Sequence, residues 1–170
     1  AHKWLCGHIE TGFMYVRPEL LPRLAPAATG WMAGADPLSF EPPRALADGA
    51  RRFATGTPAV LPALASRPGL DLVAFAGVEA IRAHSLALTA RILERAERAG
   101  LGIRTPPDPA RRGGTACLSF DGDRQVAAKL VERGFVCSHR GGLRIAPHFY
   151  NTDEEVDRFM DTLEDAQREA

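Results

Sequence analysis

The pattern of apolar and polar positions predicts helices and short strands in the second half of the chain. Apolar residues recur at helical spacing from Leu70 to Ala99, with Arg and Glu on the opposite face, and Gly100 is a typical helix stop. Short apolar runs between turn residues then predict strands at 101–104, 115–120, 135–138 and 143–146, with a helix at 124–133 that ends at Gly134. Helices and strands therefore alternate along this half.

A capping pattern marks the start of the last predicted helix. Thr152 is a good N-cap, and Glu155 stands three residues later, which together form a capping box. The acidic residues between them suit the positive end of the helix dipole. We expect a helix from this point to the end of the chain.

The first half of the chain has weaker periodicity. Residues 12–17 are aromatic and β-branched and predict a strand, and Pro18 predicts the first turn of a short helix through Leu24. Residues 25–50 are rich in Ala, Gly and Pro without a period, which predicts a long loop of the kind that usually has a function.

These elements predict an α/β protein of two unequal parts. Residues 71–170 are expected to form an α+β domain with helices on one face of a small sheet. Residues 1–70 have one predicted strand and two loops, too little for a core of their own. We therefore expect them to be the remnant of a larger domain whose beginning is absent.

Composition narrows the possible classes of protein. Lys plus Arg and Asp plus Glu number 21 each, so no net charge favours nucleic acid or an anionic membrane. No apolar run reaches the length of a membrane helix. The three cysteines are odd in number and widely spaced, which favours a reducing, cytoplasmic location. His2, Cys6 and His8 have no partner ligands elsewhere, so no metal site is predicted.

Lys3 is the first candidate for chemistry. A lone lysine is usually a solvated charge. Lys3, however, stands between His2 and Trp4, just before a turn of small residues and the apolar stretch TGFMYV. Such neighbours can remove water from an amine, which lowers its pKa and prepares it to form a Schiff base with a carbonyl compound.

The stretch from His2 through TGFMYV is similar to the lysine segment of the class V aminotransferase family of fold-type I pyridoxal-phosphate enzymes. The resemblance implies that Lys3 forms the Schiff base with pyridoxal 5'-phosphate and that His2 lies beside the cofactor. It also implies a fold: the end of the large cofactor-binding domain at 1–70, followed by the small C-terminal domain at 71–170. The chain then corresponds to the C-terminal part of a longer enzyme.

Two further segments resemble cofactor-binding loops of this family. RRFATGTPAV is similar to the loop on the phosphate side, which implies that Gly56 and Thr57 reach the cofactor of the other subunit of a homodimer. A plain turn that leads into a helix at Pro58 explains this stretch equally well. Gly30 and Trp31 resemble the loop whose tryptophan contributes to the neighbouring subunit's site, although a lone Trp is more often a packing anchor.

The segment GGLRIAPHFYNTDEEVDRF resembles the part of the family that binds the substrate carboxylate, with Arg144 as the clamp. Arg144 lies between the apolar residues Leu143 and Ile145 on a predicted strand. A planar guanidinium there is suited to hold a carboxylate by two hydrogen bonds, and a structural salt bridge is the alternative. The implied substrate is an amino acid.

The second half most resembles kynureninases, through the stretches EAIRAHSLALT, DPARRGG and ERGFVCSHRGGLRIAP. Kynureninases differ by a Tyr at the position of His2, an Asn in place of the Gly-Thr element, and a Gly-His at Ala33-Gly34. Relatives also have smaller residues at Ile9 and Glu10.

Other activities stay open from the sequence. A desulfurase needs a thiolate on a mobile loop, whereas Cys137 is predicted in a strand and Cys6 in a small turn. Transamination, epimerisation and a degenerate, non-catalytic relative remain alternatives.

Overall fold

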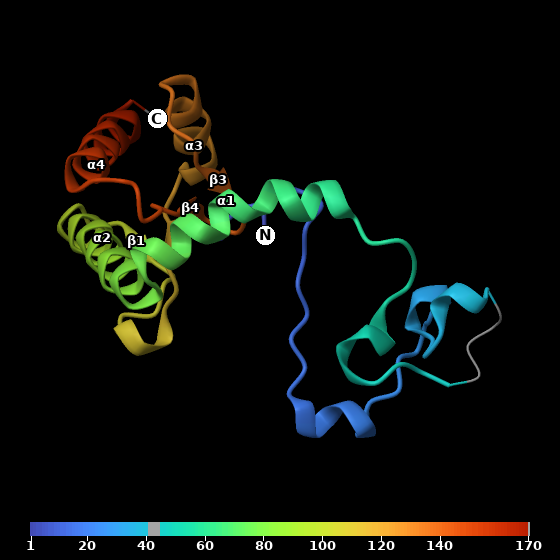
Figure 1. Cartoon of the computed structure of the whole chain (residues 1–170). Helices are drawn as coiled ribbons and strands as arrows, with labels where there is room; N and C mark the ends of the chain where they lie inside the picture. The colour runs from blue at the N-terminus through green and yellow to red at the C-terminus, as the bar shows by residue number, and fades with distance from the viewer. Residues whose placement is uncertain (41–44, 170) are drawn as a thin grey trace. The chain divides into compact units, whose positions relative to one another are not determined.

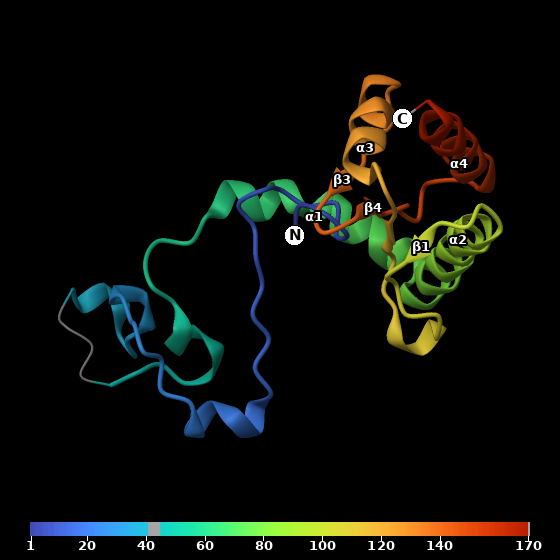
Figure 2. The ribbon, with the colours of Figure 1, turned by 180° about the vertical axis from the view of Figure 1, so that it is seen from behind.

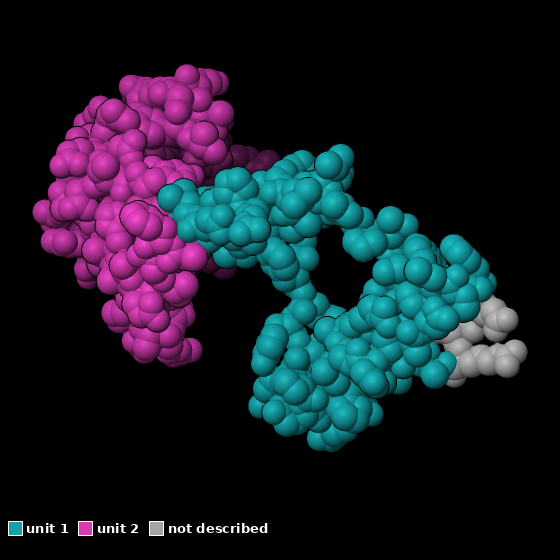
Figure 3. Space-filling view, in the orientation of Figure 1, with its two compact units in different colours: residues 1–73 teal, residues 74–170 magenta. Residues whose placement is uncertain are grey.

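The computed structural model describes residues 1–40 and 45–169 and divides the chain into two compact units, residues 1–73 and 74–170 (Figure 3). Residues 41–44 of the predicted loop at 25–50 lie outside the described residues. Each unit is described by itself below.

The second unit contains a four-stranded antiparallel sheet and three helices (Figure 1). The strands are β1 (Gly102–Ile103), β2 (Ala116–Ser119), β3 (Ser138–His139) and β4 (Leu143–Ile145), in the order β1-β2-β4-β3. The helices are α2 (Val78–Arg98), α3 (Asp123–Glu132) and α4 (Asp153–Arg168). In both views α4 lies beside α2 and α3, and it packs against each of them (Figure 2).

Alternation along the strands separates the two faces of the sheet. On β2, Ala116 and Leu118 are buried, and on β4, Leu143 and Ile145 are buried, whereas the residues between them are only half-buried. The buried face packs against apolar residues of the helices in one continuous core, whose largest fully buried members include Leu88, Ile92, Leu130, Met160 and Leu163. The predicted α+β layer is therefore confirmed: within the second unit, α2, α3 and α4 all lie on the same side of the sheet.

Local signals fix the helix ends as predicted. Gly100 has φ +68° and Gly134 has φ +86°, the left-handed conformation that ends a helix at little cost for glycine. At the start of α4, Thr152 accepts a hydrogen bond from the Glu155 backbone N–H, and the Glu155 carboxylate accepts one from Thr152 N–H at 3.0 Å. The capping box is confirmed.

Replacing Thr152 by alanine removes one half of this box. The Glu155 N–H then loses its acceptor, so we expect a loss of about 1 kcal/mol in the free energy of unfolding. Urea denaturation followed by far-UV circular dichroism measures it. Thr162→Ala is the matched control, because Thr162 lies inside α4 and its hydroxyl donates only to the Arg158 carbonyl of the same helix.

The first unit consists of short 3-10 turns, at Pro18–Arg23, Trp31–Ala33, Pro37–Ser39 and Gly49–Phe53, and most of helix α1 (Val60–Ala76). The described part of the loop at 25–50 is held by an isolated bridge between Gly34 and Leu46 and by a hydrogen bond from Ala47 N–H to the Ala33 carbonyl. The turn predicted to start at Pro18 is present, as a 3-10 helix.

Three predicted elements are wrong in type or extent. Residues 12–17 are extended but pair with no strand in the described ranges, and Phe13, Met14 and Tyr15 are exposed; a strand needs a neighbour, which the residue pattern does not specify. The helix predicted from Leu70 to Ala99 is two helices, because Gly77 adopts φ +81° and interrupts it. The strand predicted at 135–138 pairs only at its end, as β3.

No single helix within residues 1–40 and 45–169 combines the length and the apolar character needed to cross a membrane. Helices α1 and α2 meet that condition only when they are taken together across the break at Gly77.

Candidate functional site

Lys3 lies in a tight turn and its side chain is exposed. The turn is closed by hydrogen bonds from Cys6 N–H to the Lys3 carbonyl, at 3.0 Å, and from Gly7 N–H to the Ala1 carbonyl, at 2.9 Å. His2 and Trp4 are also exposed, so these neighbours do not bury the amine as the sequence suggested. The amine is accessible to a ligand.

The chain contains just two lysines, Lys3 and Lys129. The Lys129 amine donates to the Glu169 carbonyl at 2.8 Å and lies 3.7 Å from the Glu169 carboxylate. Its task is therefore to hold the end of α4. The contacts of Lys129 leave Lys3 as the lysine of this chain whose amine is not engaged within the described residues.

The turn after Lys3 accommodates the two residues in which it differs from the family. Ile9 is 69% exposed and Glu10 is exposed, and Thr11 N–H closes the turn on the His8 carbonyl at 3.2 Å. The larger side chains point to solvent and leave the backbone of the turn intact.

The structure brings Trp31 and the Gly-Thr element together. Gly30 N–H donates to the Ala54 carbonyl, and a side chain at Gly30 would collide with the Thr55 carbonyl oxygen, 1.4 Å from its Cβ position. The indole nitrogen of Trp31 is the nearest atom to the Cβ position of Gly56, at 4.0 Å. The close approach of the two loops thus requires glycine at position 30.

These loops can accept a phosphate group. Within the described residues, the Trp31 indole N–H, a hydrogen-bond donor, is the one atom found within 4 Å of the Cβ position of Gly56, and Thr57 is exposed. Backbone N–H groups, a hydroxyl and an indole N–H make a donor set that suits the phosphate of pyridoxal phosphate. The residues present therefore fit this part of the cofactor.

Arg144 lies on the face of the sheet opposite the helices α2, α3 and α4 of its own unit. Its neighbours Leu143 and Ile145 point into the core, so its own side chain points the other way. The cross-strand partners of Arg144 are Cys117 on β2 and Ser138 on β3. Within the described residues no hydrogen bond or ion pair engages its guanidinium. The structural salt bridge is thus not formed within the described residues, and the carboxylate clamp stays a prediction.

Arg104 continues this row across the sheet. Arg104 N–H donates to the Cys117 carbonyl at 2.9 Å, and its guanidinium donates to the carbonyl of Gly141 in the turn between β3 and β4. In the same turn Gly142 has φ +143° and lies so close to β2 that a Cβ would be 2.6 Å from the Leu118 carbonyl oxygen. Arg104 and Gly142 thus hold the turn that leads into Arg144, a role that the sequence did not predict.

The candidate residues belong to different units. His2, Lys3, Trp31, Gly56 and Thr57 are in the first unit, and Arg144 is in the second. Within the first unit the structure joins Trp31 to Gly56. The roles predicted for all six residues remain predictions.

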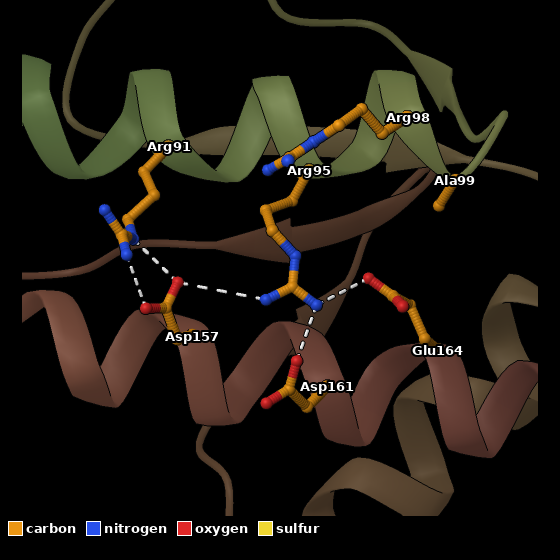
Figure 4. Close-up of a pocket in the computed structure, with 7 residues that line it drawn as sticks. All are labelled: Arg91, Arg95, Arg98, Ala99, Asp157, Asp161 and Glu164. Carbon is orange, nitrogen blue, oxygen red and sulfur yellow. Dashed lines mark hydrogen bonds and ion pairs between the residues drawn. The ribbon is translucent and has the colours of Figure 1, made fainter.

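A separate groove of about 560 Å³ is lined by charged residues of α2 and α4 (Figure 4). Arg95 reaches Asp161 at 2.6 Å and Glu164 at 2.7 Å, and Arg91 donates to Asp157 at 2.6 Å. The arginines of α2 thus form ion pairs with the carboxylates of α4, and this network holds the two helices together.

This network predicts a pH dependence of stability. The hydrogen bond from Arg91 holds the pKa of Asp157 below its ordinary value, so the pair stabilises the folded chain above the unfolded-state pKa, about 4. That contribution is lost as the pH falls through the lower, folded-state pKa. We expect Asp157→Asn to flatten the acid limb of a plot of unfolding free energy against pH. Asp165 pairs with Arg168 inside its own helix, so Asp165→Asn should leave this limb largely unchanged.

The chain is similar to known enzymes in both sequence and fold. Residues 81–163 match the kynureninase C-terminal domain family. An uncharacterized aminotransferase, YcbU of Bacillus subtilis, is 33% identical over 164 residues, which are 96% of this chain and 43% of the relative. A kynureninase of Deinococcus radiodurans is 38% identical over 132 residues, 75% of this chain and 32% of the relative.

A solved structure has the same fold. The apo structure of a cysteine desulfurase from Thermococcus onnurineus NA1 superposes with a TM-score of 0.78 at 21% identity, covering 92% of this chain and 42% of that one. The chain spans less than half the length of these relatives.

Proposed function

The chain belongs to the class V aminotransferase family of fold-type I pyridoxal-phosphate enzymes, and on this basis we propose that it carries the cofactor lysine and the carboxylate clamp of an enzyme that acts on an amino acid by kynureninase-type hydrolysis. The observation that carries the proposal is the position of Arg144. Arg144 is half-buried on the sheet face opposite α2, α3 and α4, between two strand neighbours that point into the core, and this position suits a guanidinium that binds a carboxylate.

Each residue has a stated task in this proposal. Lys3 would hold pyridoxal 5'-phosphate through its amine, and the same amine would move a proton at the substrate Cα. His2 lies beside the cofactor, while Trp31, Gly56 and Thr57 bind its phosphate side. When bound, the cofactor supplies an electron sink for negative charge at Cα.

Arg144 fixes the substrate in this proposal. It holds the α-carboxylate by two parallel hydrogen bonds, which orients the bond to be broken. We also propose a homodimer in which Trp31, Gly56 and Thr57 of one subunit complete the site of the other.

Transamination is the second candidate. The aminotransferase relative is similar over 96% of this chain, whereas the kynureninase is similar over 75%. Desulfuration is less favoured, because burial raises the pKa of the Cys137 thiol and so opposes the thiolate that this reaction needs.

Trapping the lysine tests the proposal directly. The complete protein is incubated with pyridoxal phosphate, reduced with borohydride and mapped by mass spectrometry. We expect the label on Lys3 and not on Lys129, which serves as an internal control. Equal labelling of both lysines, or none, contradicts the assignment. Cleavage of L-kynurenine without formation of an oxo acid then separates hydrolysis from transamination.

A further inference from the structure

Helix α1 buries an unusual pair of residues. Among the described residues of this helix, the buried ones are Ser66 and Gly69, and Ser66 is fully buried. The apolar residues Leu61, Leu64 and Phe75 are instead exposed. Ser66 and Gly69 are three positions apart and so lie on the same face of the helix. That face covers the turn that follows Lys3.

Ser66 joins this turn to the helix through its hydroxyl. The His8 backbone N–H donates to Ser66 Oγ at 2.7 Å, and the hydroxyl in turn donates to the Pro62 carbonyl at 2.8 Å. Both hydrogen-bonding functions of the side chain are therefore used. The His8 N–H has a buried acceptor that only a side chain with an oxygen at this position supplies.

Gly69 allows the turn to lie directly on the helix. A Cβ at position 69 would lie 2.2 Å from the Cys6 carbonyl oxygen and 2.8 Å from that of Leu5. Contacts this short do not occur, so any side chain here displaces the backbone of residues 5 and 6.

The turn held in this way is strained. Cys6 has φ +51°, a conformation that is unfavourable for a residue with a Cβ and that persists only where its surroundings enforce it. Its N–H donates to the Lys3 carbonyl, so the strained residue and Lys3 form one hydrogen-bonded turn. Release of residues 5 to 8 from α1 removes the contacts that hold Cys6 in this conformation.

We propose that Ser66 and Gly69 are positioning residues for Lys3: they dock the strained turn at Cys6 on α1 and thereby fix the lysine backbone. This inference rests on the proposed role of Lys3 as the cofactor lysine. Neither residue touches the reacting atoms, and both act through the turn.

The test uses Ser66→Ala and Gly69→Ala in the complete protein. We expect amide hydrogen exchange in residues 5–8 to become about fivefold to tenfold faster, since one hydrogen bond or one close contact is lost. We expect the rate at which Lys3 captures pyridoxal phosphate, read by borohydride trapping, to fall by a similar factor. The kcat for an amino-acid substrate should fall while its KM stays within twofold, because Arg144 is unaltered.

The controls separate docking from general damage to the fold. Gly12→Ala adds a methyl group where nothing lies within 4 Å, and Arg67→Ala truncates an exposed side chain of the same helix; neither should change exchange or capture. Ser66→Thr keeps the hydroxyl, so the amide exchange rate and the rate of cofactor capture should both be close to those of the wild type. Alanine favours helix more than glycine does, so faster exchange in Gly69→Ala reports the lost docking of the turn. If Gly69→Ala does not fold, Ser66→Ala carries the test.

Each outcome decides the proposal. Unchanged exchange in Ser66→Ala overturns the docking step. Faster exchange with unchanged capture and kcat overturns the positioning role and leaves a purely structural contact. Wild-type protein that captures no cofactor at Lys3 overturns the proposed function, and this inference with it, whatever the exchange rates are.

Discussion

Replacing Lys3 by alanine is expected to abolish covalent retention of pyridoxal phosphate and to lower kcat by about 10³-fold, because the same amine holds the cofactor and moves the proton at the substrate Cα. Lys3→Arg should not restore activity, since a guanidinium keeps its protons at any accessible pH. The measurements are visible absorbance of the dialysed protein and steady-state kinetics.

The matched control for this prediction is Lys129→Ala. It removes the second lysine of this chain, whose amine donates to the Glu169 carbonyl at the end of α4, and should affect stability but not cofactor retention. An added small primary amine should restore part of the activity of Lys3→Ala, because it can take over the proton transfer. A Lys3→Ala protein that retains the cofactor and full kcat would refute the role of Lys3.

Features that depend on neighbouring residues along the chain could be predicted from the sequence. The capping box at Thr152 and Glu155 needs a side chain and a backbone N–H only three residues apart, and it is present as expected. The glycine stops at Gly100 and Gly134 depend on a single residue each. Alternation on β4 likewise predicts that Arg144 points away from Leu143 and Ile145.

Features that depend on contacts distant in the sequence could not be predicted. The stretch from Ser66 to Gly69 contains a proline and a glycine, which disfavour the interior of a helix. It nevertheless lies inside α1, where the turn at Cys6 packs on it. Residues 12–17 have the composition of a strand but no partner in the described ranges. Composition sets how readily a segment forms a strand, but the segment becomes one only when a neighbouring strand pairs with it.

The surroundings of Arg144 illustrate the same limit. The sequence identifies the residue, but its neighbours Cys117 and Ser138 follow from the strand order β1-β2-β4-β3, in which β4 lies between two strands that precede it in the chain. The support that Arg104 gives to the turn at Gly141 depends on that order too. No local pattern specifies either contact.

Replacing Arg144 by alanine is the second large effect that we expect. The substrate carboxylate loses two charge-assisted hydrogen bonds, so the KM for the amino acid should rise by about 10²-fold, a loss of about 2.7 kcal/mol of binding free energy. Arg144→Lys keeps the charge but not the two-pronged geometry, and its KM should lie between those of the wild type and the alanine variant. Borohydride trapping at Lys3 should be unchanged in both.

Arg140→Ala is the control for this prediction, because Arg140 lies in the exposed turn before β4 and its backbone N–H, not its side chain, bonds to Gly142. Arg104→Ala should give a smaller rise in KM, since Arg104 acts on Arg144 only through the turn at Gly141. A wild-type KM in Arg144→Ala would remove the clamp from the proposal. Failure of cofactor capture in that variant would instead show that Arg144 serves the cofactor, because a group that binds only the substrate has no effect on the link between Lys3 and pyridoxal phosphate.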